Sequence, residues 1–299
     1  MKQALIVGVV AMDNIETPFG NVQNVLGGSA TYAALASSIF SQTGIIAPVG
    51  EDFPKEYLEI FEKRNIDLGG LERSGKTFRW EGFYEFDMNE AKTLRTELNN
   101  LITFMANVPE EYKESEYVFL GNIDPKLQLR VIKQLKRPRF IAMDTMNFWI
   151  EHQKSDVIDV MKNVQLVVLN DGEARMLFET VNLSRAAKEC LSLGPEAVII
   201  KKGEHGALLF TKDKHFSAPG YPLEIVKDPT GCGDSFGGAL IGYLASTDNT
   251  HEKNLRKAMI YGSAVASFTA EEFGTDRLRE LTKEEIEKRV HEFKEMRDF

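Results

Sequence analysis

Short apolar runs recur along the chain, and each is followed by a segment with the apolar spacing of a helix. Six runs of strand length are continuous rather than alternating: 4–10, 43–50, 116–122, 139–145, 166–171 and 197–203. Continuous apolar strands that alternate with helices are typical of a parallel sheet covered on both faces. The pattern therefore predicts an α/β fold with a parallel sheet between two layers of helices.

Helical patterns fill the intervals between these runs. They cover 29–40, 125–136, 154–162 and 184–194, and two long helices follow residue 230. The segment TKEE places Thr282 three residues before Glu285, which is the spacing of a capping box. The last helix is therefore predicted to begin near residue 283.

One segment, TFRWEGFYEF at 77–86, breaks the alternation of strands and helices. It is rich in aromatic residues: Phe78, Trp80, Phe83, Tyr84 and Phe86. Strands of this kind between two buried α/β units indicate a small exposed sheet that stands off the main body. We predict a single domain over 1–299 with a lid insertion at about 74–100, to which 11–25 contributes. An apolar lid face would either close over a substrate or pair with the lid of a second subunit in a homodimer.

Residues 70–77, GLERSGKT, fit the P-loop template G-x-x-x-x-G-K-[ST] without a mismatch. That motif binds phosphate only between a buried strand and the N-terminus of a helix. Here the polar segment NIDLGG precedes the match, and the extended lid segment follows it. We interpret 70–77 as a turn that leads into the lid and not as a nucleotide site.

The bulk composition narrows the class of partner. The chain has 299 residues, 43% of them hydrophobic, and a formal net charge of −9 with no basic run. Nothing here neutralises a nucleic acid backbone or an anionic membrane surface, so we expect a small-molecule partner. The two cysteines, Cys190 and Cys232, form no metal-spacing pair. Together with an N-terminal apolar run too short to span a bilayer, they predict a cytoplasmic protein.

The stretch VKDPTGCGDSFGGALIGYLAST at 226–247 is the strongest candidate for phosphate chemistry. Gly231-Cys232-Gly233-Asp234 leads directly into an apolar helix, whose free N–H groups form an anion hole reinforced by the helix dipole. Asp234 then has two interpretations: it caps the helix, or it is a general base beside a bound phosphate.

At this stretch the sequence resembles a known family. DPTGCGDSFGGAL is similar to the D-T-x-G-A-G-D-x-F-x-x-G signature of the ribokinase-like (PfkB) carbohydrate and nucleoside kinases. GGSATYAALA from Gly27, APVGEDF at 47–53, LNDGEARML and IIKKGEHGALL resemble further motifs of that family in the same order. The resemblance implies the ribokinase-like three-layer sandwich with a small β-sheet lid.

The resemblance also implies roles for individual residues, with ATP as co-substrate and Mg²⁺ as cofactor. Asp234 would be the catalytic base, and Gly231, Cys232 and Gly233 the anion hole for the transferring phosphoryl group. The other implied sites are Asp13, Gly27, Gly28, Tyr32 and Asp144 for the substrate, Lys201, Gly203 and Gly206 for the nucleotide, Asn170 and Glu173 for Mg²⁺ through water, and Asp228 and Thr230 for a monovalent cation such as K⁺. From the residues alone, Asn170 and Glu173 could also be a helix cap, and Asp13 a turn residue.

Two positions depart from the sugar-specific pattern. Tyr32 stands where sugar kinases carry an Asn, which exchanges a hydrogen-bonding amide for a stacking surface with one hydroxyl. In MDTMNFWIE, Asp144 remains from a D-x-N-x-R pattern, but no Arg follows. The missing cation makes an acidic or phosphorylated sugar a poorer candidate.

The sequence thus predicts an ATP- and Mg²⁺-dependent kinase that phosphorylates a hydroxyl of a small polyol. A sugar is the first expectation, and a nucleoside or an inositol is the alternative. A non-catalytic ligand-binding or regulatory protein on the same fold is the rival from another class. A dinucleotide-dependent oxidoreductase is disfavoured, because no G-x-G-x-x-G follows the first strand.

Overall fold

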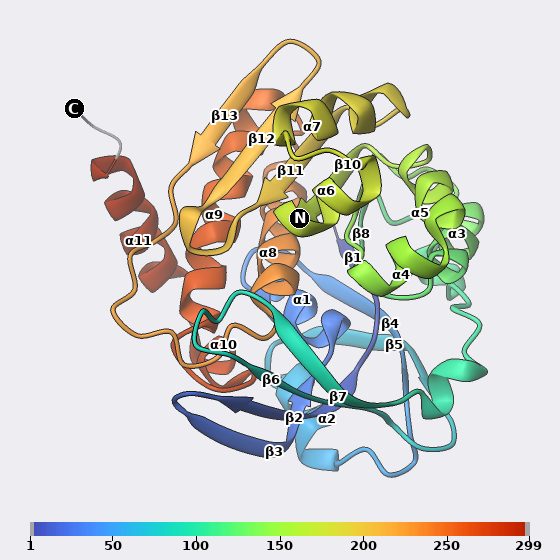
Figure 1. Cartoon of the computed structure of the whole chain (residues 1–299). Helices are drawn as coiled ribbons and strands as arrows, with labels where there is room; N and C mark the ends of the chain where they lie inside the picture. Colours follow the sequence, from blue (N-terminus) through green and yellow to red (C-terminus); the bar gives the residue numbers. More distant parts are fainter. Residues whose placement is uncertain (1–2, 297–299) are drawn as a thin grey trace.

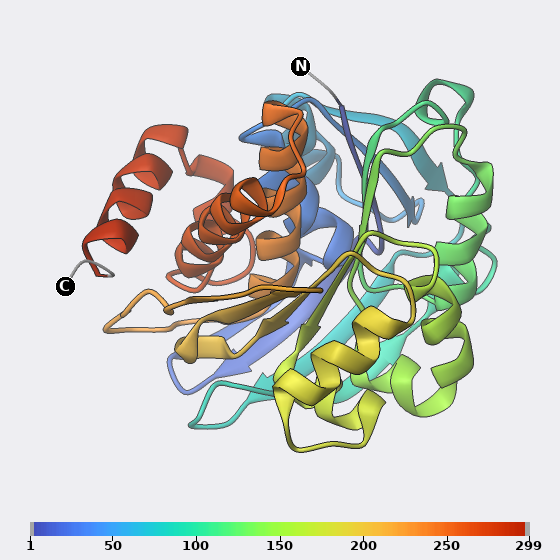
Figure 2. The same ribbon diagram turned by 90° about the horizontal axis from the view of Figure 1, so that it is seen from above.

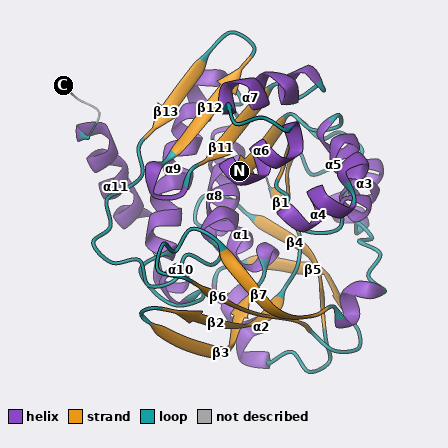
Figure 3. Cartoon of the chain, in the orientation of Figure 1, coloured by secondary structure: helices purple, strands orange, loops and turns teal. Residues whose placement is uncertain are grey.

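The computed structural model describes residues 3–296, which form two β-sheets and two layers of helices (Figures 1 and 3). The main sheet has nine strands in the order β13-β12-β11-β10-β9-β8-β1-β4-β5. Its strands are β1 (Ala4–Val7), β4 (Thr43–Val49), β5 (Ile66–Arg73), β8 (Tyr117–Leu120), β9 (Phe140–Met143), β10 (Leu166–Asn170), β11 (Ala197–Lys201), β12 (Ala207–Thr211) and β13 (His215–Ala218). β12 runs antiparallel to both of its neighbours, and the other pairs are parallel.

The helices cover both faces of this sheet, as predicted. Figure 2 shows the orange and red helices on one side of the sheet and the green and yellow helices on the other. The first layer holds α1 (Ser29–Ser38), α2 (Lys55–Lys63), α8 (Cys232–Thr247), α9 (Glu252–Thr269), α10 (Asp276–Glu280) and α11 (Lys283–Glu295). The second holds α3 (Pro125–Gln134), α4 (Asn147–His152), α5 (Lys154–Met161), α6 (Asp171–Phe178) and α7 (Leu183–Ser192).

Alternating side chains of the strands divide the interior into two cores. In β1, Ala4 and Ile6 belong to the core under α1, α8 and α9, whereas Leu5 and Val7 belong to the core under α3, α5, α6 and α7. All four are fully buried. Because successive side chains of a strand point to opposite faces, a strand buried on both faces must be apolar throughout. This explains the continuous runs in the sequence.

The first predicted strand is too long. β1 ends at Val7, and the chain leaves the main sheet at Gly8, where a Cβ would lie 2.5 Å from Ser29 Oγ. The Val9 N–H donates to the same hydroxyl at 3.0 Å. Asp13 lies in a strand of the second sheet, so its interpretation as a turn residue is wrong.

The second sheet is the lid, with the order β3-β2-β6-β7. Its strands are β2 (Ala11–Thr17), β3 (Gly20–Gly27), β6 (Phe78–Tyr84) and β7 (Ala91–Glu97). The aromatic segment predicted to form an exposed sheet is confirmed as β6, although Phe86 lies beyond the strand and is 93% exposed. In Figure 1 the lid lies across the end of the main sheet, near β4 and β5.

The segment before the P-loop match is not the polar turn that we predicted. Residues 66–73 form β5, an edge strand that pairs parallel to β4, with Ile46 opposite Gly70. Strand β6, and not a helix, follows the match, so the motif still lacks the helix N-terminus that it needs.

Candidate functional site

The N-terminus of α8 supplies open backbone donors. Gly231 is the N-cap residue, with φ at 75°, which is the left-handed region that favours glycine. The Ser235 N–H donates to the Gly231 carbonyl, whereas the Gly233 and Asp234 N–H groups have no backbone acceptor among residues 3–296. These two donors and the positive end of the helix dipole form an anion hole. Because Gly231 is the N-cap, Asp234 lies in the first turn and is not the cap.

The Tyr32 ring of α1 packs against this turn. A Cβ on Gly231 would overlap the Tyr32 ring, which is only 1% exposed. The ring therefore packs against the turn and is not open as a stacking surface, and the substrate-binding role of Tyr32 stays a prediction. The Tyr32 hydroxyl is buried without a hydrogen-bond partner among the described residues.

Asp13 of β2 approaches the same place from the lid. Its side chain is 3% exposed, and its Oδ1 has no hydrogen-bond partner among residues 3–296. Burial raises the pKa of this carboxyl to about 8, the Gly28 N–H opposes the shift, and Asp228 and Asp234 add to it. A Cβ on Gly27 would overlap Asp13 Oδ2, so the Gly27-Gly28 pair lets the carboxyl lie directly on the backbone. Such an unpartnered carboxyl oxygen can accept a hydrogen bond from a hydroxyl.

Asp234 has a carboxyl that is suited to proton transfer near neutral pH. Burial and Asp144 raise its pKa to about 7, against the opposing effects of Lys201 and the residue's own N–H. A base whose pKa lies close to the working pH is the most effective one.

Asn170 and Glu173 lie at the end of β10 and form the capping box of α6. The Glu173 N–H donates to Asn170 Oδ1 at 2.7 Å, and the Asn170 N–H donates to Glu173 Oε2 at 2.7 Å. The capping interpretation is therefore correct, but one carboxylate oxygen remains beyond these two bonds. Burial and Asp144 raise the pKa of Glu173 to about 8, against the opposing effect of Lys201.

Lys201, the last residue of β11, joins this acidic group. Its Nζ lies 2.7 Å from Asp144 Oδ2, and a Cβ on Gly233 would lie 2.8 Å from the same Nζ. Burial lowers the pKa of Lys201, but Asp144 and Glu173 outweigh it and hold the pKa above its ordinary value. A cation therefore stands beside the anion hole.

The remaining glycines predicted for the nucleotide lie in the turn between β11 and β12. Gly206 has φ at 82° and packs against the backbone of 218–220. A Cβ on Gly203 would lie 2.9 Å from Asn89 Oδ1, which belongs to the lid connection between β6 and β7. The lid thus reaches the turn that the resemblance assigns to the nucleotide.

Asp228 and Thr230 lie in the turn that enters α8. Asp228 is fully buried, and its carboxylate accepts from the Thr230 N–H at 2.9 Å and the Gly274 N–H at 2.8 Å. The Thr230 hydroxyl donates to the Tyr84 hydroxyl of the lid at 3.2 Å. The Cys232 thiol donates to the Ala266 carbonyl at 3.4 Å, and burial raises its pKa, so it is an inert packing group.

Sequence reasoning missed the lid contacts of the site. Tyr84 was marked only as one of several lid aromatics, and nothing marked Asn89. Both contacts join residues that lie far apart in the sequence, and a local pattern carries no signal for such pairs.

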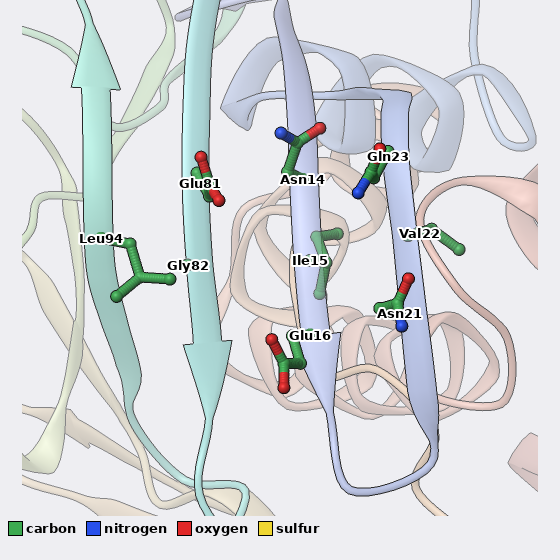
Figure 4. A pocket seen from close by; sticks show the side chains of 9 residues that line it. All are labelled: Asn14, Ile15, Glu16, Asn21, Val22, Gln23, Glu81, Gly82 and Leu94. Atoms are coloured by element: carbon green, nitrogen blue, oxygen red, sulfur yellow. The ribbon is translucent and has the colours of Figure 1, made fainter.

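The lid sheet carries a separate shallow hollow of about 200 Å³, shown in Figure 4. It is lined by Asn14, Ile15, Glu16, Asn21, Val22, Gln23, Glu81, Gly82 and Leu94. Asn14 and Glu16 alternate with Asp13 along β2, so these side chains point away from the face that carries Asp13. The hollow does not belong to the site at α8.

A half-buried carboxylate beside N–H groups without backbone acceptors, at a helix N-terminus, is suited to moving a phosphoryl group onto a hydroxyl. The chain belongs to the pfkB family of carbohydrate kinases, which matches residues 3–281. The resemblance found in the motifs is confirmed, and the protein is a phosphotransferase that acts on a hydroxyl group.

Two curated relatives cover most of the chain. It is 29% identical over 250 residues to a protein of Thermococcus kodakarensis named "Cytidine kinase", covering 81% of this chain and 89% of that protein. It is 25% identical over 296 residues to "Nucleoside kinase" of Methanocaldococcus jannaschii, covering 92% of each.

Solved structures support the fold. The crystal structure of the M. jannaschii nucleoside kinase, described as an archaeal member of the ribokinase family, superposes with a TM-score of 0.78 at 20% identity and covers 98% of this chain and 99% of that one. The predicted ribokinase-like α/β fold with its small lid sheet is therefore confirmed. Within residues 3–296, no helix is long and apolar enough to cross a membrane.

Proposed function

We propose that this kinase transfers the γ-phosphoryl group of ATP to a sugar hydroxyl of a nucleoside. The observation that carries the proposal is the Asp234 carboxyl, which lies in the first turn of α8 beside the N–H groups of Gly233 and Asp234, neither of which has a backbone acceptor among residues 3–296. A free sugar was the first expectation from sequence. The relatives named as a cytidine kinase and a nucleoside kinase favour a nucleoside, and a free sugar becomes the second candidate.

The chain's own groups divide the work of the reaction. Asp234 accepts the proton of the attacking hydroxyl, and the turn of Gly231, Cys232 and Gly233 binds the transferring phosphoryl group. Asp13 and the Gly27-Gly28 pair hold the acceptor by its hydroxyl groups. Tyr32 positions the turn, because its ring packs against Gly231.

Mg²⁺ would be held near Asn170 and Glu173. The charges fit a divalent cation, since Asp144, Glu173 and Asp234 surround the single ammonium of Lys201. Among the described residues, no three His, Cys, Asp or Glu side chains converge as direct metal ligands, so water and phosphate oxygens would complete the shell. When bound, the ion neutralises charge on the phosphates.

The other predicted sites follow from the same arrangement. The turn with Gly203 and Gly206 would receive the nucleotide, and Asn89 of the lid would close over it. A monovalent cation such as K⁺ would lie by the carbonyls of Asp228 and Thr230, where the buried Asp228 carboxylate has two N–H donors and no cationic partner within residues 3–296.

The lid would have two roles: it would cover the site at α8, and it would form the contact between the subunits of a homodimer. The bond between Thr230 and Tyr84 supports closure over the site. Phe86, 93% exposed, and Leu94, 59% exposed, support a covered surface in a dimer. The molar mass in solution of the wild type and of Phe86→Ser tests the dimer.

The test of the function is ADP formation from Mg·ATP with a panel of nucleosides, free sugars and inositols, run in parallel on Asp234→Asn. We expect turnover with a nucleoside, and a loss of kcat of about 10³-fold in the variant, since a positioned general base contributes about 10²–10⁴-fold. ATP binding should persist in the variant.

Other outcomes would redirect the proposal. Turnover confined to free sugars would assign the second candidate. Thermal stabilisation by acceptors without any phosphorylation would favour the non-catalytic binding protein.

A further inference from the structure

The ion pair of Lys201 and Asp144 crosses over a strand of the main sheet. Lys201 ends β11, and Asp144 follows the last residue of β9, while β10 lies between these two strands. The pair measures 2.7 Å, and the two side chains are 18% and 5% exposed. The ion pair therefore joins β9, which is expected to bind the acceptor, to β11, which is expected to bind the nucleotide. Asn170 ends β10, which lies between these two strands, and Glu173 follows it in α6.

The lysine ammonium lies against the backbone of the anion hole. A Cβ on Gly233 would approach Lys201 Nζ to 2.8 Å, so Gly233 leaves room for this group. Lys201 donates one N–H to Asp144, and no other described residue accepts from its ammonium. The ammonium thus lies close enough to Gly233 for its flexible side chain to reach an anion bound at the Gly233 N–H.

The surrounding carboxyl groups hold Lys201 in its charged form. Asp144, Glu173 and Asp234 all act on Lys201, so one ammonium faces three carboxyl groups. Asp144 is anchored independently, because its Oδ1 accepts from the Thr145 N–H at 2.8 Å and its carbonyl accepts from Gln128 at 3.0 Å. The anchored Asp144 carboxylate therefore restrains the flexible Lys201 side chain through the ion pair.

We propose that Lys201 contacts the transferring γ-phosphoryl group and that Asp144 is a positioning residue, which holds the lysine ammonium over Gly233. The inference rests on the proposed kinase function and deepens it. Asp144 then acts through Lys201 and does not bind the acceptor.

The step balances without a new reactant. The bond between the γ-phosphorus and the bridging oxygen breaks, and its electron pair leaves with ADP. The acceptor oxygen forms the new bond to phosphorus, and its proton passes to Asp234. Lys201 keeps its protons and stabilises the charge on the phosphoryl oxygens.

The experiment measures the binding of two Mg²⁺-loaded nucleotides by calorimetry, ADP and the β,γ-imido analogue of ATP. Lys201→Met alone leaves Asp144 buried without its cation, so the chain could fail to fold. The informative comparison is therefore between Asp144→Asn and the double variant Asp144→Asn/Lys201→Met, in which both charges are removed together. Lys154→Met is the matched control, because Lys154 and Glu179 form an exposed ion pair of 2.8 Å.

We expect loss of Lys201 in the Asp144→Asn background to weaken the imido analogue about tenfold, the value of one charge-assisted hydrogen bond, and ADP less than about threefold. Asp144→Asn alone should weaken the analogue by about two- to fivefold, because the lysine is present but no longer held. The Lys154→Met control should bind both nucleotides as the wild type does.

An equal loss for ADP and the analogue, or no loss for either, would show that Lys201 only links two strands. These affinities do not depend on the acceptor. A failure to phosphorylate nucleosides would therefore overturn the proposed function, but the calorimetry would still test the role of Lys201. A wild type that binds neither nucleotide would overturn both proposals.

Discussion

Two glycine-containing segments of this chain compete as phosphate sites, and they differ in the element that follows the glycine. Residues 70–77 fit the P-loop template, but they run from the edge strand β5 through a turn into β6. Residues 231–234 fit no such template, yet they open the 16-residue helix α8 with two N–H groups that have no backbone acceptor in the described chain. Lys76 is exposed to solvent, whereas Lys201 lies among buried carboxyls.

The difference shows that the element after a glycine turn decides whether the turn can bind phosphate. Gly75 and Gly231 both have positive φ, at 56° and 75°. A Cβ on Gly75 would meet nothing within 4 Å, whereas a Cβ on Gly231 would overlap the Tyr32 ring. Only Gly231 packs a backbone turn against a buried ring, that of Tyr32, at the positive end of a helix dipole.

The largest expected effect comes from Gly231→Ala. The added methyl group must displace the turn or the Tyr32 ring, so the anion hole loses its geometry, and we expect kcat/KM to fall about 10²-fold or more. Steady-state kinetics with Mg·ATP measures this, and thermal melting checks that the fold remains. Activity within threefold of the wild type in a folded variant would mean that the turn does not bind the transferred group.

A change of pH should produce the next largest effect. Asp234 must be ionised to accept a proton, and its pKa of about 7 lies above the ordinary value because of burial and Asp144. The base is therefore protonated as pH falls, and we expect kcat/KM to drop about tenfold from pH 8 to pH 6. Circular dichroism over the same range separates this loss from unfolding, and a flat profile would contradict the assignment of the base.

Gly75→Ala gives the matched glycine comparison. Alanine at a positive φ is strained, so we expect the free energy of unfolding to fall by about 1–2 kcal/mol. The kinetic constants should stay within about twofold, because the turn before β6 holds no phosphate. Chemical denaturation and kinetics on the same preparation measure the two effects, and a large rise in KM for ATP would reverse the comparison.

Lys76→Met should have the smallest effect. In a P-loop this lysine reaches the terminal phosphates, but here it is exposed on a turn. We expect KM for ATP and kcat to change less than about twofold, within the range of ordinary surface substitutions. A tenfold loss of ATP affinity would restore the P-loop interpretation.

The sequence predicted the elements that are apolar on both faces and missed those that are not. Strands β8 to β11 appear as continuous runs, whereas the polar pattern of β5 predicts a turn, because an edge strand needs few buried side chains. The first predicted run, 4–10, continues past the end of β1 at Val7, since the break at Gly8 depends on its contact with Ser29. The motif residues of α8, β10 and β11 do gather at one place, but the approach of Asn89 to Gly203 could not be predicted, since only the folded lid brings these residues together.

The most direct test of where phosphate binds is hydrogen exchange of the backbone amides with and without the Mg²⁺-loaded imido analogue of ATP. The account predicts slower exchange at 231–234 and at 203–206, and the same rate at 70–77. The Gly233 and Asp234 N–H groups should be the most affected, because they have no backbone acceptor within residues 3–296. Protection at 70–77 with unchanged exchange at 231–234 would contradict the account.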